Sequence, residues 1–173
     1  MARALAWMLV LGMPSLLLGQ THSELSAWRT LYRQTAEGGP ADSAIVPMTA
    51  ALQAHPNNAV CMAFHATAQL QKAQELWNPF DKLTTFQTWR PVLDSTLEVL
   101  PHNPDLALLR LGVQSHTPSF LDYDQAMATD AQHVRAALTA GHWDNDPDHA
   151  AFVRDFFTYL ETCLLYTSPS PRD

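Results

Sequence analysis

The sequence predicts an all-α protein, built as a stack of about six or seven antiparallel helices. Apolar residues recur at spacings of three and four along most of the chain, which is the period of a helix with one buried face. Prolines and asparagines separate these stripes at intervals that suit helix ends. The chain has no clear period-two run and no Asn-Gly or Asp-Gly hairpin turn, which argues against a sheet.

The first two predicted helices are short and well delimited. Thr21 and Glu24 stand at capping-box spacing, and 37–40 (Glu-Gly-Gly-Pro) ends the first helix. The second helix is expected over 42–55, with Pro47 near its first turns, where proline costs least. The inward stripes are Leu25, Trp28, Tyr32 and Thr35 in the first helix and Ile45, Met48 and Leu52 in the second.

The third and fourth helices meet at a break over 77–81. The third begins after 55–58 (His-Pro-Asn-Asn) and its apolar stripe runs from Val60 to Trp77. Asn78 can then cap a fourth helix that has Pro79 in its first position and extends to about Leu100. Pro91 falls inside that helix, so we expect it to kink the helix or split it in two.

The last three helices follow the same rules. Residues 103–105 (Asn-Pro-Asp) repeat the start signal before a short apolar helix over 106–114, and 115–119 form a loop. A sixth helix is expected from about Tyr123 to Ala140, with Gly141 ending it. Residues 146–148 (Asp-Pro-Asp) open a seventh.

Composition narrows the class of protein. The chain has 173 residues, 47% of them hydrophobic, which suits one folded domain and excludes a disordered chain. It carries 10 Lys and Arg against 17 Asp and Glu, for a net charge of −7 without a basic cluster. This balance argues against nucleic acid as a partner.

The N-terminus has the pattern of an export signal. Arg3 precedes an almost wholly apolar run over 4–18, and small and polar residues follow from Gly19. We expect residues 1–19 to be a cleavable signal peptide, which would make the mature protein periplasmic or secreted. The run is short and interrupted by Pro14, so no transmembrane span is expected in the mature chain.

The C-terminal segment 163–173 resembles translated sequencing adapter. Its eleven residues, CLLYTSPSPRD, can be back-translated codon for codon into the read-through of a transposase-based library adapter. We therefore expect the native domain to occupy 20–162 and to be truncated at its C-terminus. Cys61 would then be the single native cysteine, either a buried hydrophobe or the partner of a cysteine in the missing part.

Two helix junctions resemble those of tetratricopeptide repeats. The phrases at 51–59 and 96–104 each end a helix in Pro-x-Asn and open the next, at Pro56-x-Asn58 and Pro101-x-Asn103. The junctions stand 45 residues apart, whereas the tetratricopeptide unit has about 34, and the full repeat pattern is absent. The resemblance implies a tetratricopeptide-like α-α superhelix with a longer middle hairpin.

Two further segments, 77–86 and 109–123, resemble a group of exported Gram-negative bacterial proteins with no assigned activity. They carry Trp77-Asn78-Pro79-Phe80 and the pattern Leu109-Arg110-Leu111 followed by Pro118-x-Phe120-Leu121. The likeness would span most of the mature chain, but the surface here is poorer in lysine.

Metal and catalytic motifs are weak. None of the eight histidines forms a His-x3-His pair, and no Gly-x-Ser-x-Gly elbow occurs. Asp144, Asp146, Asp148 and Asp155 copy calcium-loop positions 1, 3, 5 and 12, although His149 replaces the required glycine. The same segment is explained by a helix start with acids at its positive end. We assign no catalytic residue and no cofactor.

A binding surface is the better-supported hypothesis. A helix stack presents a concave face, and Arg110 is the polar residue expected to face it from an otherwise apolar helix. The loop 117–124 is a candidate binding element. The leading interpretation is an exported scaffold that binds a protein or peptide; the alternatives are a small-ligand or calcium-binding envelope protein, or an enzyme whose site lies in the missing part. The proposed binding residues are Trp77, Phe80, Trp89, Arg110, Phe120 and Tyr123.

Overall fold

A computed structural model describes the backbone of residues 21–167 and the side chains of 21–162. The predicted signal peptide 1–19, residues 168–173 and the side chains of the adapter-like segment lie outside this part. Within it, the chain forms seven α-helices and no strand, which confirms the all-α prediction. The elements are α1 His22–Ala36, α2 Asp42–Ala54, α3 Ala59–Glu75, α4 Pro79–Val99, α5 Pro104–His116, the 3-10 helix η1 Ser119–Leu121, α6 Met127–Thr139 and α7 Pro147–Thr167.

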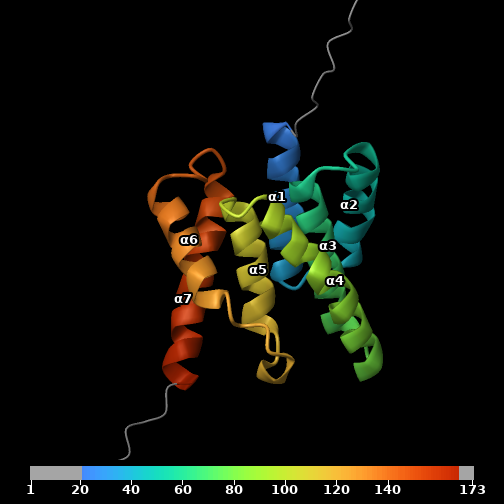
Figure 1. The fold of residues 1–173 in the computed structure, drawn as a ribbon. Helices are drawn as coiled ribbons and strands as arrows, with labels where there is room; N and C mark the ends of the chain where they lie inside the picture. Colours follow the sequence, from blue (N-terminus) through green and yellow to red (C-terminus); the bar gives the residue numbers. More distant parts are fainter. Residues whose placement is uncertain (1–20, 168–173) are drawn as a thin grey trace, which may run out of the picture.

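The helices form hairpins that stack side by side (Figure 1). Within the hairpins α2 packs on α1, α4 on α3 and α6 on α5. Between the hairpins α3 contacts both α1 and α5, so it occupies the centre of the stack. The last helix, α7, returns to contact α1.

The helix starts follow the sequence signals. At α1 the Thr21 hydroxyl accepts from the Glu24 N–H while the Glu24 carboxylate accepts from the Thr21 N–H, which completes the predicted capping box. The Asn78 side chain caps α4, and that of Asn103 accepts from two backbone N–H groups of α5. Both of these helices have proline in their first position, as predicted.

Two helix ends depend on glycine. Gly38 (φ +99°) and Gly141 (φ +75°) follow α1 and α6 in the left-handed conformation that residues with a Cβ adopt at a cost. The next residues donate back across the last turn, Gly39 to the Gln34 carbonyl at 2.9 Å and His142 to the Ala137 carbonyl at 3.0 Å. These bonds are those of a Schellman cap, which satisfies the terminal carbonyls.

Two helix boundaries differ from the expected ones: α4 is not split at Pro91, and the sixth helix begins later than expected. Helix α4 runs without a break through Pro91, because Phe86, Leu93 and Leu97 on either side of the proline are anchored in the core. The sixth helix begins at Met127 rather than near Tyr123, because η1 and the left-handed Asp122 (φ 50°) reverse the chain first.

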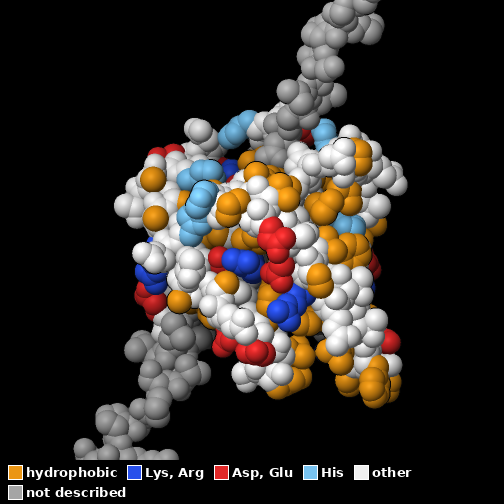
Figure 2. Space-filling view, viewed as in Figure 1, with side chains coloured by type: hydrophobic (Ala, Val, Ile, Leu, Met, Phe, Trp, Pro, Cys, Tyr) orange, Lys and Arg blue, Asp and Glu red, His pale blue; other side chains and the backbone are white. Residues whose placement is uncertain are grey.

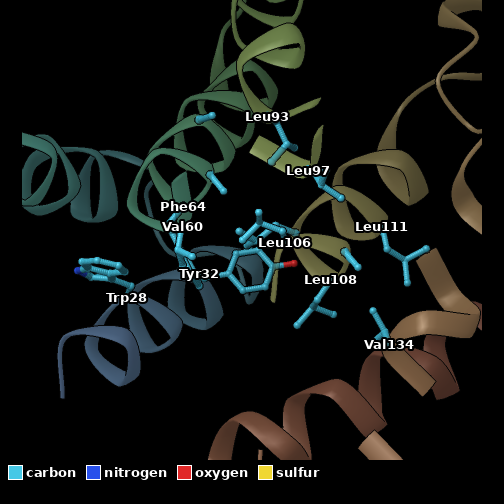
Figure 3. Close-up of a cluster of buried hydrophobic side chains, with 14 of the residues drawn as sticks. Trp28, Tyr32, Val60, Phe64, Leu93, Leu97, Leu106, Leu108, Leu111 and Val134 are labelled. Atoms are coloured by element: carbon cyan, nitrogen blue, oxygen red, sulfur yellow. The ribbon is translucent and has the colours of Figure 1, made fainter. Parts of the chain in front are cut away.

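The core takes buried side chains from every helix from α1 to α7, including Met48 of α2 and Val153 and Phe157 of α7. Figure 3 shows the part of it that lies between α1, α3, α4, α5 and α6. Helices α3 and α5 are buried almost throughout, and the small Ala63 and Ala66 let neighbouring helices approach α3 closely. Cys61 is 0% exposed in this core, and burial raises the pKa of its thiol to about 11. Its surroundings are those of a small hydrophobe. No helix among the described residues is both long and apolar enough to cross a bilayer.

Candidate binding groove

A groove of about 1360 Å³ runs across one side of the stack. Helices α1, α3, α5 and α7 line it, and the start of α4 with the η1 segment closes one end. The even-numbered helices α2 and α6 contribute no lining residue. The groove is therefore formed by the odd-numbered helices together with the first two turns of α4.

Aromatic rings form a continuous ladder along one wall of the groove. Phe152 and Phe156 of α7 stack at 6.5 Å between ring centroids, and Tyr159 stacks on Phe156 at 6.5 Å. Tyr32 of α1 packs edge-on against Phe152 at 5.6 Å, and His116 of α5 stacks on Tyr159 at 5.8 Å. All five residues line the groove. Three helices thus hold one apolar wall in a fixed arrangement.

The charges in the groove are mainly negative. Asp148 and Asp155 of α7 and Glu37 after α1 are exposed in it, and none forms an ion pair with another residue of the described part. Glu75 is neutralised by Lys72 at 2.9 Å. Arg33 is the one lining arginine, and it pairs with Asp146.

Two of the predicted binding residues lie in this groove. Phe80, at the start of α4, is 79% exposed, and Phe120, in η1, is 82% exposed. Both offer a large apolar surface at the end of the groove that α4 and η1 close. Trp77 is 95% exposed at the turn before α4, but it is not a lining residue. Figure 2 shows apolar side chains gathered at this protruding end of α4.

The other three predicted binding residues lie elsewhere. Trp89 is half-buried with its ring against His65 at 5.1 Å. Tyr123 is buried and donates to the Asp94 carboxylate at 2.7 Å. Arg110 forms a bidentate pair with Asp130 at 2.7 and 2.8 Å, and this hydrogen bonding raises the pKa of its guanidinium.

These last contacts belong to a charged network outside the groove. Arg90 lies over the Tyr123 ring at 4.5 Å and pairs with Asp94 at 3.5 Å. Asp94 also lies 3.9 Å from Arg110, so the network joins α4, α5 and α6. Figure 2 shows acidic and basic side chains in contact near the centre of the face in view. The role that the structure gives Arg110 is to hold neighbouring helices together.

The four aspartates of the calcium-like pattern point to different places. Asp146 faces Arg29 and Arg33 of α1, whereas Asp148 and Asp155 line the groove. Asp144 lies against Gly141 in the turn after α6. Over the described residues, no group of three or more His, Cys, Asp or Glu side chains is placed to hold a metal ion.

A buried polar cluster supports the groove wall from behind. Arg29 of α1 donates to both carboxylate oxygens of Asp105 in α5 at 2.9 and 2.8 Å, and the Trp143 indole donates to the same carboxylate at 3.0 Å. Burial alone would raise the pKa of Asp105, but hydrogen bonds from His142, Arg29 and Trp143 hold it well below its usual range.

His149 is the unusual member of this cluster. Its side chain is fully buried, and neither ring nitrogen has a hydrogen-bond partner within the described structure. Its Nε2 lies 3.8 Å from Asp105, too far for a hydrogen bond. Burial lowers its pKa to about 4. The ring stacks on Phe152 at 5.9 Å, so it supports the first rung of the aromatic ladder on α7.

Sequence reasoning missed the contribution of α7. The signal was present: Asp148, Phe152, Asp155, Phe156 and Tyr159 share one helical face, so carboxylates interrupt an otherwise apolar stripe. The neighbouring Val153, Phe157 and Leu160 are buried in the core, so the stripe that the sequence shows most clearly on this helix is the core-facing one.

No family model, no curated protein and no solved structure matches this chain.

Proposed function

We propose that this chain is an exported helical scaffold whose groove docks a segment of another polypeptide. Export rests on the signal pattern of residues 1–19, and docking rests on the groove that α1, α3, α5 and α7 line. The observation that carries the proposal is the combination of a volume of about 1360 Å³ with Phe80 and Phe120 exposed at its end.

The size of the groove favours a polypeptide over a small ligand. Pockets for small molecules typically have volumes of about 300–1,000 Å³ and enclose most of the ligand. This groove is larger than that range. Its exposed aromatic side chains lie where a longer occupant would cover them.

The architecture also indicates which secondary structure the bound segment has. Extended peptides commonly bind by adding a strand to a sheet edge, but the described part of this chain has no strand. Grooves between helices instead receive an amphipathic helix, whose apolar side chains at spacings of three and four enter the groove. A partner helix is the segment that this surface fits.

Panning of a phage library of random 15-residue peptides tests the proposal. We expect selected sequences to carry apolar residues at helical spacing and to lose binding to Phe120→Asp or Phe80→Asp. Val46→Asp is the matched control, because Val46 is 70% exposed on α2, which contributes nothing to the groove. Selected peptides that bind all three variants as they bind the wild type would refute docking in the groove.

A further inference from the structure

Helix α7 presents acids and aromatics in alternation along one face. Asp148 and Asp155 are seven residues apart, which is two helical turns, or about 10 Å along the axis. Phe152 lies between them, and Phe156 and Tyr159 continue the same face into the ladder. A partner segment lying along α7 would therefore contact the apolar Phe152 ring between two carboxylates, those of Asp148 and Asp155.

Neither carboxylate forms an ion pair within the described structure, and Asp148 lies in the first turn of α7. The ion pairs of the described structure include neither residue, whereas the lining acid Glu75 has Lys72 and the lining cation Arg33 has Asp146. Glu37 adds a third free carboxylate at the end of α1. Lys82 is the one lining cation without a carboxylate partner in this part of the chain, and its Nζ donates to the Gln74 carbonyl at 3.3 Å. The free charge of the groove is thus negative.

Resting on the docking function proposed above, the geometry points to a cationic amphipathic helix as the occupant. We propose that its apolar side packs on the aromatic ladder while two basic side chains, seven residues apart, face Asp148 and Asp155. Residues at that spacing share one side of a helix, so one partner helix can reach both carboxylates at once. Both carboxylates are exposed and therefore accessible to the basic side chains of a partner helix.

Two synthetic 14-residue peptides test this choice of partner. Both have the same leucine face; one carries Lys on its polar flank and the other carries Glu at the same positions. Fluorescence anisotropy of the labelled peptides gives each affinity for the full chain. We expect the Lys peptide to bind at least tenfold tighter than the Glu peptide, and we expect this ratio to shrink in 1 M salt, where charges are screened.

Charge-reversal variants then test whether Asp148 and Asp155 cause the preference for the Lys peptide. Asp148→Lys/Asp155→Lys should invert the order of the two peptides, and the milder Asp148→Asn/Asp155→Asn should bring the two affinities close together. The matched control, Glu98→Lys/Asp124→Lys, changes the net charge equally at two exposed acids outside the groove and should keep the wild-type preference. Circular dichroism verifies that each variant folds.

The outcomes separate this inference from docking itself. Equal affinities for the Lys and Glu peptides in the wild type, or a preference that the Glu98/Asp124 control also removes, would overturn the inference. Docking would still stand or fall on the panning result with Phe80, Phe120 and Val46.

Discussion

At the scale of single residues, the buried cluster at Asp105 shows how one carboxylate organises its neighbours. Arg29 and Trp143 donate hydrogen bonds to the Asp105 carboxylate at 2.8 to 3.0 Å, and Arg29 reaches both of its oxygens. His149 therefore forms no short bond with this carboxylate. His149 is consequently enclosed as a neutral ring, since protonation would place a charge near Arg29 and Arg33 in a site without water access. The cost of burying a histidine without hydrogen bonds must be met by packing, including its stack on Phe152.

This arrangement predicts how stability depends on pH. The pKa of His149 is about 4 when folded, against an ordinary value of 6.5. Below pH 6.5 the unfolded chain therefore binds a proton that the folded protein excludes, so the free energy of unfolding decreases as pH falls towards 4. The linkage relation gives a loss of about 2 kcal/mol between pH 7 and pH 5 from this group.

Urea unfolding of wild type and His149→Leu at pH 7 and pH 5 measures the effect. The variant lacks the titrating ring, so its stability should decrease by about 2 kcal/mol less than that of the wild type over this interval. His102→Leu changes an exposed histidine and should keep the wild-type slope. If the slopes of His149→Leu and wild type coincide, His149 does not carry the pH dependence.

At the scale of elements, the two prolines of α4 differ in how much they destabilise the helix. Pro79 stands in the first helical position, where its missing N–H would have no helical partner in any case. Pro91 stands in the interior, where it removes one helix hydrogen bond, yet the helix continues. Phe86 and Leu93, on either side of the proline, are both buried in the core.

Replacing each proline by alanine should separate these costs. Proline in a helix interior is about 3 kcal/mol less favourable than alanine, and the exposed Pro91 side chain gives up little packing when it is removed. We expect Pro91→Ala to raise the free energy of unfolding by 1 kcal/mol or more and Pro79→Ala to leave it nearly unchanged, as measured by urea titration. A Pro91→Ala protein no more stable than the Pro79→Ala protein would show that the interior proline carries no net cost in this fold.

The helix starts with side-chain caps were predictable, and the partners of buried polar residues were not. Capping at Thr21, Asn78 and Asn103 is local chemistry, so a few consecutive residues specify it. The continuity of α4 and the place of Arg110 depend on residues distant in sequence. Arg110 looked like a groove residue because its own helix is apolar; its partner Asp130 lies 20 residues further on, in α6.

The existence of a groove was predictable from the sequence, but only some of its lining residues were. A helix stack implies a concave side, and the exposed Phe80 and Phe120 were identified from the aromatic pattern. The wall formed by α7 was missed, because the same spacing of Phe152, Phe156 and Tyr159 fits a buried stripe equally well. Which face of an amphipathic helix meets a neighbour and which remains open is decided by the packing of the whole stack.

At the scale of the molecule, α7 closes the stack against the first helix. Asp146 accepts from Ser26 at 3.1 Å and from Arg33 at 3.4 Å, and it lies 3.8 Å from Arg29. Its carboxylate also accepts from the His149 N–H at 3.2 Å, which caps α7. One side chain thus joins two helices that are more than one hundred residues apart and that both line the groove.

Asp146→Asn should therefore loosen α1 and α7 together. Asparagine can still cap α7 through its side-chain oxygen, but it loses the charge that faces Arg29 and Arg33. We expect a loss of about 2 kcal/mol in the free energy of unfolding, in the range for hydrogen bonds to charged groups. Hydrogen exchange followed by mass spectrometry should show faster exchange in α1 as well as α7, with α2 much less affected. Faster exchange confined to the first turn of α7 would mean that Asp146 acts as a local cap and that the closure of the stack rests on apolar contacts alone.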